Sequence, residues 1–152
     1  MSLLLVADIG GTNGRFGLVE YDTENARING KINYTAERQI TLKCADHADM
    51  ATMIKPCCAQ FGIDIPAYGC LAIAGPIENG QASMTNLNWK FSIDGLRDQL
   101  GMKTLHVIND FASLAYAVPF LKEDELVTLY ESNKSNAEAP IVVMGPGTGF
   151  GM

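Results

Sequence analysis

The segment best suited to chemistry lies near the start of the chain, where the apolar residues 3–7 run into Asp8-Ile9-Gly10-Gly11-Thr12-Asn13. Apolar residues return after it, so the pattern predicts a strand, a tight glycine turn and a second strand. Adjacent glycines allow positive φ angles and close approach of a ligand to the backbone N–H groups. A carboxylate, a hydroxyl and oriented amides suit a metal-bound phosphate. The alternative is an ordinary hairpin whose polar residues have no role.

A second reactive position is Asp110, which follows Asn109 directly after the apolar residues 105–108. A carboxylate at the end of a buried strand can accept a proton from a hydroxyl nucleophile, so we take Asp110 as the general base. Taken alone, the same residue also fits the N-cap of a helix that begins at Phe111. Asn109 is interpreted either as a hydroxyl-binding neighbour or as a turn residue.

A glycine-rich run, Gly147-Thr148-Gly149, follows the apolar residues 141–144. Its backbone N–H groups and its hydroxyl predict a second phosphate-binding loop, and a plain glycine turn is the alternative. The run is not a dinucleotide fingerprint, because Phe150 stands where the third glycine is needed.

Amide side chains stand beside an indole in residues 85–89, where Asn86 and Asn88 precede Trp89. An aromatic ring packs on the C–H face of a sugar while amides bind its hydroxyls, so this segment predicts a sugar-binding loop. Trp89 as an ordinary core residue is the alternative.

The strands that must position these residues share one pattern. Residues 3–7, 68–74, 105–108 and 141–144 are each nearly all apolar, as parallel strands covered on both faces are, and each ends at glycine or a small polar residue. In an open α/β sheet, ligands bind beyond the carboxyl ends of parallel strands. The ends of these four strands are therefore predicted to meet at one site.

The remaining segments complete an α/β domain. The first two strands and an edge-like strand at residues 32–40 predict an antiparallel meander. Residues 50–61 have helical apolar spacing, with Pro56 inside the run. Ser92 predicts the N-cap of a helix that ends at Gly101. Further expected elements are a short strand at residues 81–85 and a helix over residues 111–118 that Pro119 stops.

Composition limits the class of protein. The chain has 152 residues, 47% hydrophobic and 18% charged, which is typical of globular α/β proteins. A net charge of −6 argues against a nucleic-acid partner, because no basic face is available for the phosphates. The apolar run at residues 3–7 is too short for a membrane span or a signal peptide, so we expect a cytoplasmic protein without a membrane partner.

Four motifs taken together resemble those of bacterial glucokinases in identity, order and spacing. They are Asp8-Ile9-Gly10-Gly11-Thr12-Asn13, Met84-Thr85-Asn86-Leu87-Asn88-Trp89, Ile108-Asn109-Asp110-Phe111 and Gly145-Pro146-Gly147-Thr148-Gly149-Phe150-Gly151. The resemblance implies the actin-like, ribonuclease H-like α/β fold, in which an antiparallel meander and parallel strands form one mixed sheet with flanking helices, and two domains face a cleft. The implied reaction is transfer of the γ-phosphoryl group of ATP to the 6-hydroxyl of glucose.

Carried over residue by residue, the resemblance gives each motif a role. Asp110 is the catalytic base, and Asp8 acts on Mg²⁺ through water. The implied sugar ligands are Asn86, Asn109, Asp110 and Gly147. The implied contacts to ATP are Asp8, Gly10, Gly11, Thr12 and Asn13 in one loop, and Gly147, Thr148 and Gly149 in the other.

Members of the family continue past the second glycine loop, whereas this chain ends at Met152. We therefore expect residues 1–110 to form the first domain and residues 111–152 to begin a larger, truncated second domain. We expect a homodimer for the full-length protein, and little or no phosphate transfer by this chain alone, because part of the cleft is absent. The alternatives are a non-catalytic sugar-sensing module of the same fold, and a kinase that takes another hexose or uses polyphosphate. Gly14 stands where the family leads us to expect alanine.

Overall fold

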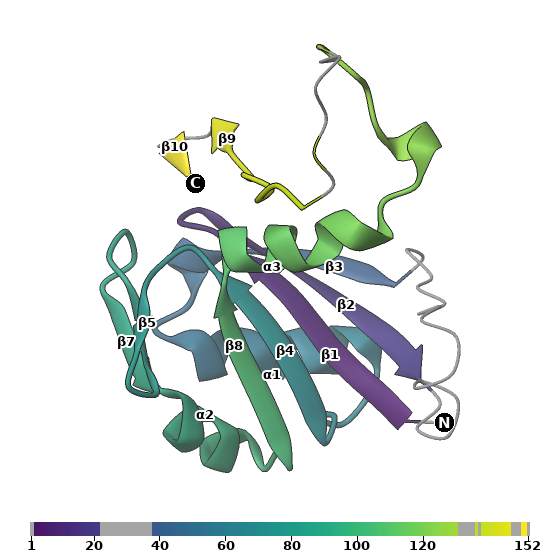
Figure 1. Cartoon of the computed structure of the whole chain (residues 1–152). Coiled ribbons are helices and arrows are strands. Elements are labelled where there is room, and N and C mark those ends of the chain that lie inside the picture. Colours follow the sequence, from purple (N-terminus) through teal and green to yellow (C-terminus); the bar gives the residue numbers. More distant parts are fainter. Residues whose placement is uncertain (1, 22–37, 131–135, 137, 147–149, 152) are drawn as a thin grey trace. The chain divides into compact units, whose positions relative to one another are not determined.

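The computed structural model describes residues 2–21, 38–130, 136, 138–146 and 150–151 of the chain (Figure 1). The chain divides into two compact units, Met1–Asp110 and Phe111–Met152. The first unit contains the apolar core and most of the elements that carry the predicted site. That the two units are domains of a glucokinase-like protein stays a prediction.

A mixed five-stranded sheet forms the centre of the first unit, with the strand order β3-β2-β1-β4-β8. Its strands are β1 (Ser2–Ile9), β2 (Asn13–Tyr21), β3 (Gln39–Lys43), β4 (Tyr68–Ile73) and β8 (Thr104–Asn109). Strands β1, β2 and β3 pair antiparallel, whereas β1, β4 and β8 pair parallel. This confirms the predicted fold class, an antiparallel meander followed by parallel strands.

The register of the parallel strands brings their carboxyl ends level. Ile9 at the end of β1 is opposite Ile73 of β4, and Ile73 is opposite Asn109 of β8. The residues that follow β1, β4 and β8 therefore all leave the sheet at the same edge.

The core of the first unit lies on one face of this sheet. In β1, Leu5, Ala7 and Ile9 are buried, because alternate side chains of a strand point to the same face. Helix α1 (Met50–Phe61) lies behind the sheet in Figure 1 and adds Met53 and Ile54, both fully buried, to the same cluster.

Helix α1 has clear signals at both ends. Asp49 and Thr52 form a capping box, in which the Thr52 N–H donates to Asp49 Oδ1 at 2.7 Å and the Asp49 N–H donates to Thr52 Oγ1 at 3.0 Å. Gly62 ends the helix in the left-handed conformation with φ of 71°. The helix is continuous through Pro56, which removes one backbone donor without dividing it.

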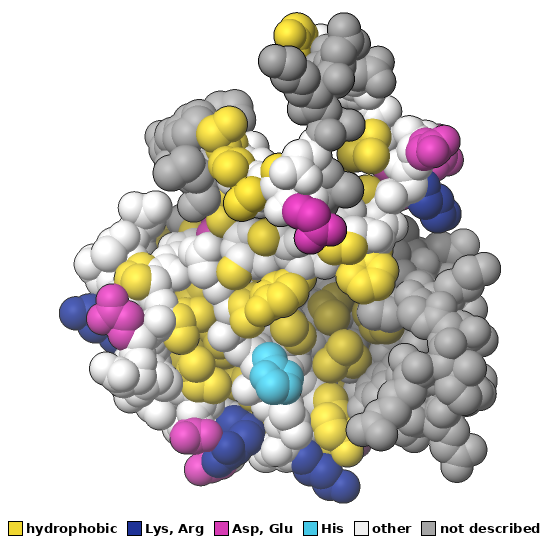
Figure 2. Space-filling view, in the orientation of Figure 1, with side chains coloured by type: hydrophobic (Ala, Val, Ile, Leu, Met, Phe, Trp, Pro, Cys, Tyr) yellow, Lys and Arg dark blue, Asp and Glu magenta, His cyan; other side chains and the backbone are white. Residues whose placement is uncertain are grey.

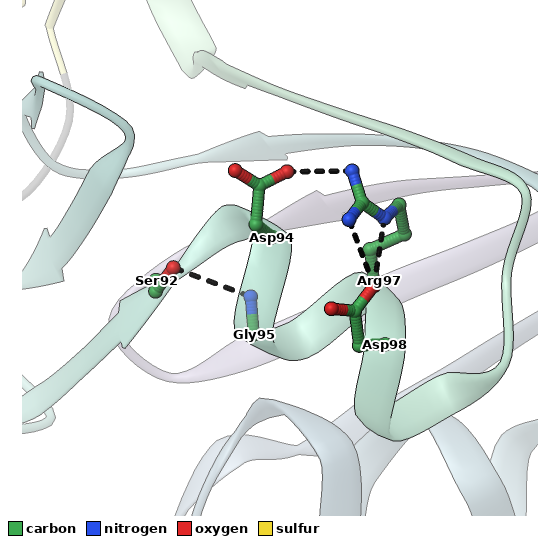
Figure 3. A network of polar contacts seen from close by, with 5 residues as sticks. All are labelled: Ser92, Asp94, Gly95, Arg97 and Asp98. Carbon is green, nitrogen blue, oxygen red and sulfur yellow. Dashed lines mark hydrogen bonds and ion pairs between the residues drawn. The ribbon is translucent and has the colours of Figure 1, made fainter.

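Helix α2 (Ile93–Leu100) begins and ends as predicted. The Gly95 N–H donates to Ser92 Oγ at 3.2 Å, and Gly101 follows the helix with φ of 69°. On its exposed side, Arg97 donates to Asp94 at 2.6 Å and to Asp98 at 2.8 Å (Figure 3). These carboxylates, Asp98 above all, raise the pKa of Arg97.

A second, smaller sheet follows β4 along the chain. It has the order β5-β6-β7, with β5 (Ile77–Glu78), β6 (Gln81–Met84) and β7 (Trp89–Ser92) in antiparallel pairs. The sequence pattern predicts only β6. Strands β5 and β7 are missed because they are short and lack a clear alternation of apolar and polar residues.

Two predicted strands are corrected by the structure. The third strand of the meander was expected at residues 32–40, but β3 is Gln39–Lys43, and residues 32–37 lie outside the described part. Residues 141–144 form no strand, although they are apolar. A strand needs a paired neighbour, and among the described residues of the second unit only β9 (Gly145–Pro146) and β10 (Phe150–Gly151) pair.

The other described elements of the second unit are short. They are helix α3 (Asp110–Ala117), whose first residue ends the first unit, and the 3₁₀ turns η2 (Val118–Phe120) and η3 (Glu123–Glu125). Pro119 lies inside η2, so the α-helix ends just before it, close to the predicted end.

The face of the large sheet turned away from α1 carries apolar side chains that are only half-buried, among them Leu4, Val6 and Ile108. Figure 2 looks onto this face and shows hydrophobic side chains spread over it. None of the described helices is both long and apolar enough to cross a lipid bilayer.

Candidate functional site

The glycine turn between β1 and β2 is closed and braced by the backbone. The Gly10 N–H donates to the Asn13 carbonyl at 3.0 Å. Buried Cys44, just after β3, supports the turn twice: its N–H donates to the Thr12 carbonyl at 2.9 Å, and its thiol donates to the Gly10 carbonyl at 3.5 Å. Burial raises the pKa of the Cys44 thiol, which keeps its hydrogen at neutral pH.

A close contact, rather than an unusual backbone torsion angle, accounts for a glycine in this turn. Adjacent glycines allow positive φ, yet the described glycines with positive φ are Gly62, Gly80 and Gly101. A Cβ built on Gly11 would instead lie 3.0 Å from Nδ2 of Asn86. Gly10 and Gly11 therefore do not use this freedom of the backbone, and a close neighbour explains Gly11.

Asp8 lies at the carboxyl end of β1 and faces solvent. Its Oδ2 accepts from Nη1 of Arg15 at 3.3 Å, with side-chain exposures of 57% for Asp8 and 69% for Arg15. The two residues are opposite each other in the β1–β2 register. Such an exposed ion pair contributes little to stability, so Asp8 can exchange Arg15 for another cationic partner.

Asp110 reaches the same edge of the sheet from β8. It directly follows Asn109, and β4 is the single strand between β1 and β8. Asp8 is level with Ala72 and Ile108 in the register, and Asp110 lies two residues beyond Ile108. Two inter-strand spacings and this offset place the backbones of the two acids about 12 Å apart. Asp110 is the first residue of α3 rather than the residue before the helix, so it does not occupy the N-cap position.

Asn109 is oriented by the end of the neighbouring strand. Its Nδ2 donates to the Gly75 carbonyl at 3.3 Å. Gly75 in turn packs tightly, because a Cβ built on it would lie 2.0 Å from the Ser83 carbonyl oxygen. The Ser83 N–H donates to the Pro76 carbonyl at 3.1 Å, which ties β6 to the segment after β4. The sequence marks Gly75 only as a strand end.

The turn between β6 and β7 brings a predicted sugar ligand to this edge. Asn86 is exposed in that turn and lies against Gly11. Trp89, in contrast, is 6% exposed and belongs to the core cluster. The idea that its indole packs on a sugar is wrong; the ring is an ordinary core residue that anchors β7.

The residues present suit a cation held mainly through water and phosphate oxygens. Asp8 offers carboxylate oxygens to solvent, and the Thr12 hydroxyl lies four residues on in the turn. The described part of the chain has no group of three or more His, Cys, Asp or Glu residues arranged to hold a metal ion. A hard cation bound chiefly by substrate oxygens, as Mg²⁺ often is, fits this donor set.

The structure thus brings Asp8, the turn at residues 10–13, Asn86, Asn109 and Asp110 to one edge of the first unit. Gly147, Thr148 and Gly149, the predicted second phosphate loop, lie outside the described residues. One supporting residue was missed: Cys44, which gives no signal in sequence as a turn brace. Gly75, before Pro76 at a strand end, was expected near the site, but its contacts to Asn109 and Ser83 were not predicted.

Comparison with known proteins places the chain in a family. The family model described as Glucokinase matches residues 5–152. A glucokinase of Caulobacter vibrioides is 38% identical over 148 residues, which are 97% of this chain and 42% of that protein. A glucokinase of Paramagnetospirillum magneticum is 36% identical over 151 residues, 99% of this chain and 43% of that protein. The chain thus spans less than half the length of these curated relatives.

Solved structures agree with the fold. A glucokinase crystal structure from an Antarctic psychrotroph matches with a TM-score of 0.78 and 37% identity, over 99% of this chain and 45% of that one. A glucokinase of Balamuthia mandrillaris in complex with glucose matches with a TM-score of 0.51 over 77% of this chain and 32% of that one. At 22% identity, the second match supports the fold alone.

Proposed function

This chain belongs to the glucokinase family, and from that premise we propose that the whole protein transfers the γ-phosphoryl group of ATP to the 6-hydroxyl of glucose. The observation that carries the proposal is the meeting of Asp8 and Asp110 at one edge of the sheet, at the ends of parallel strands β1 and β8. A phosphoryl-transfer site needs a group on the cation side and a base on the alcohol side, and the presence of two acids at this edge supports the proposal.

Asp110 is the proposed base. Its carboxylate accepts the proton of the sugar hydroxyl as that oxygen attacks the γ-phosphorus, and the bond from phosphorus to the β–γ bridging oxygen breaks to release ADP. Asn86 and Asn109 bind sugar hydroxyls in this proposal, as does Gly147. The hydrogen bond from Asn109 to Gly75 supports it, because an oriented amide holds an alcohol better than a mobile one.

The phosphates are proposed to lie against the first glycine turn, formed by Gly10, Gly11, Thr12 and Asn13, with Gly147, Thr148 and Gly149 as the second loop. Asp8 is proposed to hold Mg²⁺ through water. When bound, Mg²⁺ supplies neutralisation of the phosphate charge. The brace from Cys44 supports this role for the turn, since preorganised N–H donors stabilise charge without reorganising.

The proposal covers the whole protein rather than the 152 residues. We expect this chain alone to transfer phosphate slowly or not at all, because a site that is not closed admits water. Cytoplasmic location and assembly as a homodimer belong to the same proposal.

The substitution Asp110→Asn in the whole protein tests the proposal. Loss of the base should lower kcat for glucose by about two to four orders of magnitude, while calorimetry still shows glucose binding. A coupled assay of ADP release measures the rate. Asp64→Asn is the matched control, because Asp64 is an exposed acid in the loop between α1 and β4. Phosphorylation by Asp110→Asn at the wild-type rate would remove Asp110 from the mechanism.

A further inference from the structure

Two turns from distant parts of the sequence touch at the candidate site. A Cβ built on Gly11 would lie 3.0 Å from Nδ2, 3.2 Å from Cβ and 3.5 Å from Cγ of Asn86. Favourable contacts between non-bonded carbon atoms are about 3.5–4.0 Å. A residue larger than glycine at position 11 would therefore require the Asn86 side chain to move by a few tenths of an ångström.

The neighbouring glycine has no such constraint. A Cβ built on Gly10 would meet only the Asn13 carbonyl oxygen, at an ordinary distance of 3.7 Å. Neither Gly10 nor Gly11 has a positive φ, so backbone torsion does not explain either residue. Of the two glycines in the turn, only Gly11 would contact Asn86 if it carried a side chain.

Both turns are held in place, so the contact is not easily relieved. Cys44 donates to the carbonyls of Gly10 and Thr12, on either side of Gly11. On the other side, the Leu87 N–H donates to the Met84 carbonyl at 3.1 Å and closes the turn that carries Asn86. A larger side chain at position 11 must therefore displace the Asn86 side chain rather than the backbone.

We propose that Gly11 is a positioning residue for the sugar: by leaving room for Asn86, it sets the direction of the amide that binds the substrate hydroxyl. The inference rests on the proposed function, which gives Asn86 to the sugar and the Gly11 turn to the phosphates. It adds that a residue of the phosphate turn controls sugar affinity even when no nucleotide is bound.

A double-mutant cycle in the whole protein tests this role, with Gly11→Ala, Asn86→Gly and the two combined. The dissociation constant for glucose is measured by calorimetry without nucleotide. Each single substitution should weaken glucose binding roughly tenfold, the effect of one lost or misdirected hydrogen bond. The double variant should bind no more weakly than Asn86→Gly, because the methyl group added at position 11 then has no side chain to displace.

Gly95→Ala is the matched control, since it adds the same methyl group within helix α2, where it meets only Ser92 at an ordinary 3.4 Å and not Asn86. Its glucose affinity without nucleotide should stay within about twofold of the wild type. The inference is overturned if Gly11→Ala leaves this affinity unchanged and raises only the KM for ATP. It is equally overturned if the two effects multiply in the double variant.

Thermal unfolding of the same proteins reports on the contact without any ligand. Gly11→Ala should lower Tm in the wild-type background and not in the Asn86→Gly background. If the wild type neither binds nor phosphorylates glucose, the proposed function fails and this role for Gly11 fails with it. If the wild type binds glucose and the cycle is additive, only the present inference fails.

Discussion

At the scale of single residues, the site depends on places where a side chain is absent. Gly75 is the tightest of these, because a Cβ there would lie 2.0 Å from the Ser83 carbonyl oxygen. That oxygen belongs to the backbone of β6, which cannot rotate away as a side chain does. The Gly75 carbonyl also accepts the hydrogen bond from Asn109 Nδ2, so the same residue affects both the packing and the orientation of a site side chain.

Gly75→Ala is expected to destabilise the fold by about 3 kcal/mol or more, since the added methyl group must push two backbone segments apart. Urea unfolding gives the midpoint and the free energy of unfolding. Gly95→Ala is the control: a Cβ there would meet Ser92 at an ordinary 3.4 Å, within helix α2. Alanine in a helix should be neutral or stabilise by about 0.5 kcal/mol. Equal stability of the Gly75→Ala variant and the wild type would contradict the close approach.

Gly14 shows why such fits are hard to predict from sequence. A Cβ there would lie 2.6 Å from Cε of Met53, so the end of this methionine fills the space that the expected alanine would take. Met53 is a core residue of α1, far from Gly14 in the chain. That the terminal methyl group of Met53 takes the place of an alanine side chain at position 14 can be seen only in the folded structure.

At the scale of elements, apolar runs were the most reliable signal. The predicted strands at residues 3–7, 68–74 and 105–108 match β1, β4 and β8 to within a few residues, because a strand buried in a parallel sheet has few polar positions. Caps were equally informative, since Ser92 and Gly101 bound α2 as expected.

The same signal fails where pairing decides the structure. Residues 141–144 are as apolar as β8 but form no strand, and Ile141, Val142 and Met144 are exposed. An apolar run by itself does not show that a paired neighbour is present. The candidate site shows a similar division. The motifs predicted which residues gather at the edge of the sheet, whereas the contact between Gly11 and Asn86 required the geometry of two turns.

Helix α1 carries two adjacent thiols, and these give the element a dependence on pH. Burial raises the pKa of Cys57 from 9.0 to about 12, and the charge of Cys58 adds to the rise. The unfolded chain therefore loses this proton first as the pH increases, and the native state becomes less stable. Stability from Cys57 is complete below pH 9 and is lost up to about pH 12.

The free energy of unfolding should accordingly fall in this window, by at most about 1.4 kcal/mol per pH unit for one thiol. Urea unfolding at a series of pH values measures the slope. The other cysteines have raised pKa values as well, so Cys57→Ala should reduce the slope without abolishing it. A slope unchanged by Cys57→Ala would show that this thiol does not titrate differently in the two states.

At the scale of the whole molecule, the two units differ in how many of their described side chains are buried. Every residue of the buried core cluster lies in the first unit, between Leu5 and Val107. The described residues of the second unit include no buried side chain, and Val127, Leu129 and Tyr130 are more than four-fifths exposed. Among the described residues, the buried apolar core is thus formed by the first unit, which also carries Asp8, Asn86 and Asn109.

A chain that ends at Asp110 is therefore expected to fold cooperatively by itself. Its length is well above the size of about 40 residues below which disulfides or metals are usually needed. Trp89 is the one tryptophan of the sequence and is buried in this core, so its fluorescence reports on the first unit only. Residues 1–110 and the 152-residue chain should show the same blue-shifted emission and closely similar thermal transitions. Residues 111–152 alone should show no cooperative transition by circular dichroism. Red-shifted emission from residues 1–110 would mean that the second unit completes the core, and the edge of the sheet would then depend on both.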